Sequence, residues 1–185
     1  QGRLDFGIGR SAFPSVYQGY GMDYNESRGR FNECLEVLLR AWTMERFSFE
    51  GEYYRYQDVC VVPKPRQTPH PPIRVGVTSA ETFAIGGRLG YPILVNPSRA
   101  FTLLGLAPYI LEYRRARREA GYQEEGEVGL RVPVYVAETA QRAYEEPRES
   151  TTYQMQRLVD VVTASAAQSG IADNRQAQAK QLKAI

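Results

Sequence analysis

The amino-acid sequence predicts an α/β fold with a parallel sheet, and two observations indicate this class. Short apolar segments with strand periodicity alternate along the chain with segments of helical periodicity, an order typical of parallel strands joined by helices. About four of the predicted strands are each followed by a helix, which amounts to half of an eight-stranded α/β barrel. The length of 185 residues predicts a single domain over 1–185 or a large part of one, since a complete barrel usually needs about 250 residues.

The first strand is predicted over Leu4–Gly9, where apolar residues alternate with Asp or Gly, and Arg10 follows it directly. After a loop over residues 11–24, the spacing Asp23-x-x-Glu26 resembles a capping box and predicts a helix that runs to about Met44. Its apolar residues recur at helical spacing and should face the core: Phe31, Leu35, Leu38, Leu39 and Trp42. Because Cys34 flanks this stripe, we expect a packed thiol rather than a reactive one.

The middle of the chain predicts an inserted hairpin and then a strand with its helix. Aromatic residues flank the turn signal Glu50-Gly51-Glu52, which indicates a β-hairpin over residues 46–62. The proline-rich segment Pro63–Pro72 is a stiff, extended connector. The segment Ile73–Val77 is then predicted to form a short apolar strand. A helix follows to Leu89, with cap chemistry at its start and Gly90 as its C-terminal cap.

The last third predicts two more strands and their helices. Tyr91–Val95 is a short apolar strand, and helical spacing follows from Phe101 until Gly121. Val128–Val136 alternates like a strand, although Pro133 within it weakens that interpretation. A further helix is predicted from Thr139 until Pro147, and residues 164–185 form a polar tail that is either helical or mobile.

Composition excludes several classes of function. The 23 Lys and Arg nearly balance the 21 Asp and Glu, for a net charge of +2, so we expect no nucleic-acid partner. No apolar run approaches the roughly 20 residues of a membrane span, so we expect no membrane association. With His70 as the one histidine and no CxxC pair between Cys34 and Cys60, we predict no metal site. Free thiols indicate a reducing, cytoplasmic location.

Two strand ends carry side chains that suit a phosphate group. Function in α/β folds gathers at the carboxyl ends of parallel strands. Arg10 supplies a guanidinium after the first strand, while Thr78, Ser79 and Thr82 place hydroxyls and free amides at a helix start. The alternative is that the hydroxyls only cap the helix and that the arginine forms a surface ion pair. Glu81 counts against a phosphate unless its carboxylate points away.

Five groups of residues also occur in a characteristic order. They are Gly2–Arg10, then Asn25–Arg28 with Trp42–Thr43, then Phe47–Tyr54, then Pro63–Pro65 with His70–Ile73, and finally Ser79–Thr82 with Arg88–Gly90. Each motif alone is weak. The series, which extends over about Gly2–Pro147, resembles the bacterial luciferase-like family of flavin-dependent monooxygenases.

This resemblance implies a TIM-type (β/α) barrel that binds reduced FMN and uses O2 to oxygenate a small organic substrate. It implies that Arg10, Ser79 and Thr82 hold the flavin phosphate, with Thr78 at the neighbouring position of the phosphate loop. An enzyme of this kind is an oxidoreductase, to which a separate flavin reductase would supply the reduced cofactor. The organic substrate itself is left open.

The chain also departs from the family pattern. The first family strands, which carry the active-site histidine, would precede Gln1, and the last strand is not seen after Thr139. We therefore expect an incomplete barrel whose catalytic residues lie upstream, and we do not assign His70 to catalysis. Two alternatives remain: a deazaflavin-dependent oxidoreductase of the same fold, and a non-catalytic flavin-binding protein. Because a partial barrel exposes sheet edges, we expect a homo-oligomer.

Overall fold

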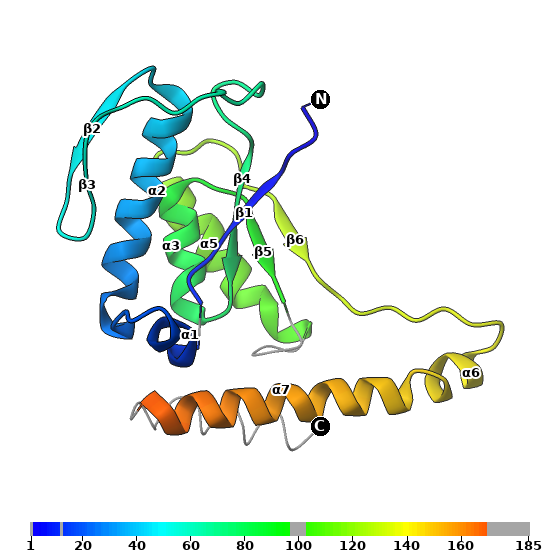
Figure 1. Cartoon of the computed structure of the whole chain (residues 1–185). Coiled ribbons are helices and arrows are strands. Elements are labelled where there is room, and N and C mark those ends of the chain that lie inside the picture. The colour runs from blue at the N-terminus through cyan, green and yellow to red at the C-terminus, as the bar shows by residue number, and fades with distance from the viewer. Residues whose placement is uncertain (1, 12, 97–102, 170–185) are drawn as a thin grey trace.

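The computed structural model describes residues 2–11, 13–96 and 103–169 (Figure 1). Its centre is a four-stranded sheet in the order β1-β4-β5-β6. The strands are β1 (Phe6–Ile8), β4 (Ile73–Val77), β5 (Ile93–Val95) and β6 (Val128–Leu130), and all neighbours are parallel. This arrangement confirms the predicted α/β class with four parallel strands.

Helical crossovers join the strands, as the alternation predicted. The helix α2 (Ser27–Thr43) lies between β1 and β4, α3 (Ala80–Leu89) between β4 and β5, and α5 (Ala107–Glu119) between β5 and β6. A short 3-10 helix, η2 (Leu104–Leu106), precedes α5. The predicted start of that helix at Phe101 falls outside the described residues.

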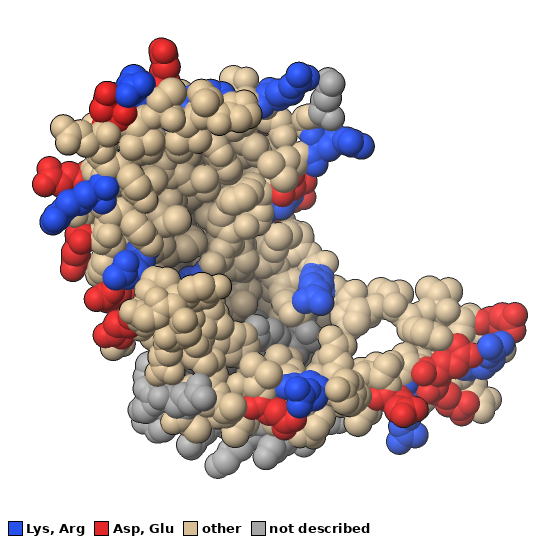
Figure 2. Space-filling model, viewed as in Figure 1, with Lys and Arg blue, Asp and Glu red and all other residues tan. Residues whose placement is uncertain are grey.

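The core lies between one face of the sheet and the helices α3 and α5. It consists of Val75, Val77, Phe83, Ile93, Val95, Leu106 and Tyr113, each 6% exposed or less. The opposite face of the sheet is open: Gly76 is exposed, and the side chain of Leu94 is 41% exposed. In Figure 2 the middle of the viewed surface is hollowed and uncharged, and charged side chains lie around it. In a complete barrel this sheet face would line the interior.

Two polar contacts fasten the C-terminal end of α3 to α5. Gly90 ends α3 in the left-handed conformation, with φ of 74°, which glycine adopts at no steric cost. The guanidinium of Arg117, 7% exposed, donates one hydrogen bond to the Gly90 carbonyl and another of 2.8 Å to that of Glu124. The hydroxyl of Tyr113 donates to the carbonyl of Tyr91 at 3.0 Å. These bonds hold α3 in place against the sheet.

The predicted hairpin over residues 46–62 is present as a separate antiparallel pair, β2 (Phe47–Glu50) and β3 (Arg55–Val59). The carboxylate of Glu33, on α2, accepts hydrogen bonds of 2.7–3.1 Å from the backbone amides of Glu52, Tyr53 and Tyr54 in its turn. Partial desolvation raises the pKa of Glu33, but these amides outweigh it and leave the pKa below its ordinary value. One side chain thus joins the hairpin to α2.

Three local predictions for the N-terminal part need correction. The expected loop over 11–24 contains a helix, α1 (Pro14–Gly19), before the 3-10 helix η1 (Tyr24–Glu26). Asp23 caps η1 by accepting from the amide of Asn25 at 2.8 Å, whereas Glu26 forms an ion pair with Arg30. Cys34 is exposed rather than packed. The stripe beside it is half-buried, and its residues Phe31 and Leu35 line a cavity instead of dense core.

The C-terminal part also differs from the predicted strand. β6 ends at Leu130, and Pro133, which lacks an N–H for a ladder bond, lies in an exposed extended segment. The helix α6 (Ala140–Glu145) begins after Thr139, where a helix was predicted, and α7 (Arg148–Ser169) crosses beside the carboxyl ends of the strands (Figure 1). Its Ser165 accepts a hydrogen bond of 3.3 Å from Ser15 of α1. The predicted polar tail over 164–185 is helical up to Ser169, and its remainder lies outside the described residues.

Candidate functional site

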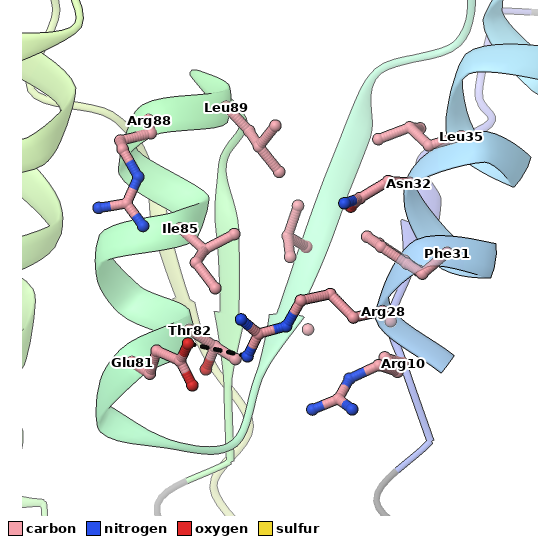
Figure 3. A pocket seen from close by; sticks show the side chains of 13 residues that line it. Arg10, Arg28, Phe31, Asn32, Leu35, Glu81, Thr82, Ile85, Arg88 and Leu89 are labelled. Atoms are coloured by element: carbon pink, nitrogen blue, oxygen red, sulfur yellow. Dashed lines mark hydrogen bonds and ion pairs between the residues drawn. The ribbon is translucent and has the colours of Figure 1, made fainter. Parts of the chain in front are cut away.

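A cavity of about 420 Å³ lies between α2 and α3, next to the carboxyl ends of β1 and β4. Figure 3 shows the side chains that line it. Arg10, Arg28, Glu81 and Thr82 lie together at the end near the strand termini, whereas Arg88 lies at the other end of α3, beside Leu89 (Figure 3). The wall comprises Gly9, Arg10, Arg28, Phe31, Asn32, Leu35, Val75, Gly76, Glu81, Thr82, Ile85, Arg88 and Leu89. The cavity therefore combines an apolar surface with a cluster of guanidinium groups.

The first predicted site residue, Arg10, is on this wall and is oriented by two neighbours. Its Nη1 donates a hydrogen bond of 2.9 Å to the hydroxyl of Ser27, the first residue of α2. Ser27 is 2% exposed, so that hydroxyl is a fixed acceptor. The guanidinium also lies 5.5 Å from the ring centroid of Tyr24. The side chain of Arg10 itself remains exposed and can donate further hydrogen bonds to an anion.

A tyrosine beside this arginine remains a neutral hydrogen-bonding group. Burial raises the pKa of Tyr17, and the positive charge of Arg10 opposes that shift without cancelling it. The Tyr17 ring packs edge-on against that of Tyr24, with centroids 5.3 Å apart. The Tyr24 ring thus contacts both Tyr17 and the Arg10 guanidinium.

The second predicted site residue, Thr82, is on the same wall, but it also caps its own helix. Its Oγ1 accepts hydrogen bonds from the amides of Thr78 and Ser79 at 3.3 and 3.2 Å, and donates one of 2.6 Å to the Ser79 carbonyl. The prediction that these two amides are free is therefore wrong. Thr78 and Ser79 are exposed next to the cavity and do not line it. The structure brings Arg10 and Thr82 to one cavity and leaves the other two at its edge.

A second arginine reaches the cavity from α2 and was not singled out from the sequence. Nη2 of Arg28 donates a hydrogen bond of 2.8 Å to Oε1 of Glu81 on α3 (Figure 3). The negative charge that counted against a phosphate is thus paired with a cation. Its position in the sequence could have indicated this role, because Arg28 precedes Phe31 by one helical turn and lies on the side of the helix that carries the apolar stripe.

His70 lies away from this cavity, in agreement with its interpretation as a structural residue. Its ring stacks against that of Trp42 with centroids 5.9 Å apart, and Nδ1 is 2.8 Å from the carbonyl oxygen of Pro71. Within the described part of the chain, no three His, Cys, Asp or Glu side chains are grouped as metal ligands would be. None of the described helices is both long and apolar enough to cross a membrane.

The parallel sheet, its crossover helices and a cationic cavity at the strand ends define part of a TIM-type barrel. The chain belongs to the luciferase-like monooxygenase family, whose family model matches residues 1–185. The chain is 33% identical over 91 residues to the FMNH2-dependent dimethylsulfone monooxygenase of Pseudomonas putida, a match that covers 48% of this chain and 25% of the relative. It is 32% identical over 93 residues to an F420-dependent glucose-6-phosphate dehydrogenase of Segniliparus rotundus, covering 48% and 27% respectively.

A solved structure extends this similarity over most of the chain. The monooxygenase RslO1 from Streptomyces bottropensis superposes with a TM-score of 0.76 at 27% sequence identity. The match covers 90% of this chain and 51% of RslO1. The chain therefore spans about half the length of that relative, in agreement with the four strands of its sheet.

Proposed function

We propose that this chain is the flavin-phosphate-binding part of a flavin-dependent monooxygenase, which uses reduced FMN and O2 to oxygenate a small organic substrate. One observation carries the proposal. In a member of this family, the guanidiniums of Arg10 and Arg28 and the hydroxyl of Thr82 meet at one cavity beside the strand ends. Guanidiniums are strong, directional donors to phosphate oxygens.

The residues present fit the phosphate of FMN. Arg10, oriented by Ser27, supplies charge and hydrogen bonds. The Thr82 hydroxyl, which donates to the Ser79 carbonyl, would turn to donate to the phosphate at the start of α3. The backbone amides of Thr78 and Ser79, at the cavity edge, donate to the Thr82 hydroxyl oxygen. They would donate hydrogen bonds to the phosphate if a phosphate oxygen replaced that hydroxyl oxygen as their acceptor. The flavin, when bound, supplies the redox chemistry with oxygen. The part of this chain is to bind and orient the cofactor, and no catalytic residue is assigned to it.

The test is a comparison of two flavins that differ in the phosphate. Arg10→Ala should weaken FMN binding about 10-fold or more, because hydrogen bonds to charged groups contribute about 1.5–3 kcal/mol. Riboflavin, which lacks the phosphate, should bind equally to both proteins. Arg115→Ala is the matched control, since Arg115 is an exposed arginine of α5, paired with Glu112 and Glu119. Equal weakening of both flavins by Arg10→Ala would contradict the assignment.

A second candidate is a deazaflavin-dependent oxidoreductase that transfers hydride without oxygen. The F420-dependent relative, at 32% identity, favours it. Uptake of O2 with reduced FMN and hydride transfer from a reduced deazaflavin under anaerobic conditions separate the two functions. A non-catalytic flavin-binding protein would bind flavin and show neither activity.

The remaining parts of the proposal concern the whole enzyme. The dimethylsulfone monooxygenase that this chain resembles is named as dependent on FMNH2, the reduced form of FMN. We propose that a separate flavin reductase supplies reduced FMN to the present enzyme as well. We place the enzyme in the cytoplasm because Cys34 and Cys60 are both free thiols. A homo-oligomer would protect the outer edges of β1 and β6, which no described strand covers.

A further inference from the structure

We propose that Glu81 competes with the flavin phosphate for Arg28 and thereby sets how tightly the site holds FMN. This inference rests on the proposed flavin-phosphate site. It assigns Glu81 as an affinity-determining residue: a carboxylate of the protein that must give up its cation before the cofactor is fully bound.

The geometry places the carboxylate where a competing anion would act. Glu81 is in the first turn of α3, directly before Thr82, and its Oε1 accepts the 2.8 Å hydrogen bond from Nη2 of Arg28. The two residues belong to different helices and are 53 positions apart in the sequence. Figure 3 shows the pair bridging α2 and α3, with Arg10 beside Arg28. A phosphate between Arg10 and Thr82 would therefore lie close to both members of the pair.

Charge explains why the pair would open. Among the described residues that line the cavity, Glu81 is the one carboxylate, whereas three guanidiniums, those of Arg10, Arg28 and Arg88, line the same cavity. A phosphate dianion next to an unmoved Glu81 would experience repulsion between like charges. If the phosphate took over Arg28, the carboxylate could turn away into solvent.

The ion pair is weak enough to be displaced. One nitrogen of Arg28 contacts one oxygen of Glu81, and their side chains are 58% and 60% exposed. Exposed pairs of this kind contribute little, whereas guanidinium–phosphate contacts are often bidentate and stronger. The competition should therefore lower FMN affinity modestly without preventing binding.

The experiment measures FMN and riboflavin affinity in Glu81→Gln, which keeps the shape of the side chain and removes its charge. We expect FMN to bind about two- to fivefold more tightly, a range set by the strength of an exposed ion pair, and riboflavin to be unchanged. Glu119→Gln on α5 is the matched control because it removes the same charge from another exposed ion pair, with Arg115. It should leave both affinities unchanged.

An Arg28→Ala background distinguishes competition from simple repulsion. If Glu81 acts by occupying Arg28, the gain from Glu81→Gln should largely disappear once Arg28 is gone. An equal or larger gain in that background would overturn the proposal, as would unchanged or weaker FMN binding by Glu81→Gln itself. Glu81→Asp, which keeps the charge on a side chain one methylene shorter, provides a second variant and should lose part of the competition.

The same titrations separate failure of this inference from failure of the proposed function. Arg10→Ala, measured in parallel, reports on the phosphate site alone. If it weakens FMN selectively while Glu81→Gln has no effect, the site stands and the role of Glu81 is refuted. If Arg10→Ala weakens both flavins equally, the phosphate site itself is refuted, and the role of Glu81 with it.

Discussion

The close contact between α3 and α5 permits a stability prediction worked from distances. A Cβ added at Gly87 of α3 would lie 2.4 Å from the carbonyl oxygen of Tyr113 and 3.1 Å from the amide nitrogen of Arg117, both on α5. These are backbone atoms, so no change of rotamer relieves the contact. Gly87→Ala must therefore separate the two helices by about 1 Å before an ordinary van der Waals distance is restored.

Two opposing effects set the size of the change in stability. Overpacking a dense interior costs about 1–3 kcal/mol, and replacing glycine by alanine within a helix recovers up to about 1 kcal/mol. Because the contacts are with backbone atoms, the overpacking cost should lie in the upper part of that range, at about 2–3 kcal/mol. Less about 1 kcal/mol for the helix propensity, the net loss in the free energy of unfolding should be about 1–2 kcal/mol. For a chain of 185 residues, this corresponds to a Tm lowered by about 2–8 °C.

Thermal unfolding followed by circular dichroism measures this effect. Gly19→Ala is the matched control, since Gly19 ends α1 and a Cβ there meets no atom within 4 Å. The control should keep the wild-type Tm to within about 2 °C. A Tm of Gly87→Ala equal to or above that of the wild type would refute the spacing of α3 and α5 described above.

Two further predictions concern Glu33, which joins the hairpin to α2, and Arg10, which we propose binds the flavin phosphate. Because the pKa of Glu33 is lowered in the folded chain, its contribution to stability is present above the unfolded pKa of about 4.3 and is lost as the pH falls through the folded value. The Tm of Glu33→Gln should therefore lie below that of the wild type at pH 7, and the difference in Tm between the two proteins should decrease towards pH ~3. A difference in Tm that does not depend on pH would contradict this prediction. Ser27→Ala removes the 2.9 Å hydrogen bond that orients Arg10 and should weaken FMN binding about 2- to 10-fold without affecting riboflavin. Equal effects on the two flavins in titrations would assign Ser27 a purely structural role.

The sequence by itself determined the elements whose signals are local. The strand Ile73–Val77 has the bounds predicted from its apolar run, and α3 ends before Gly90 as its cap predicted. The hairpin over residues 46–62 followed from a turn signal between aromatic segments. In each case neighbours in the chain provide the interaction that defines the element, so the pattern of residues was sufficient.

Only the tertiary structure decided which side chains meet at the cavity. Arg10 and Ser27 are 17 positions apart, and Arg28 and Glu81 are 53 apart, so no local spacing predicts either contact. The helical stripe of α2 showed which face is apolar, but not that this face borders a cavity or that Cys34 beside it is exposed. Periodicity fixes the direction of a side chain relative to its own helix, whereas its partner depends on how the helices pack on the sheet.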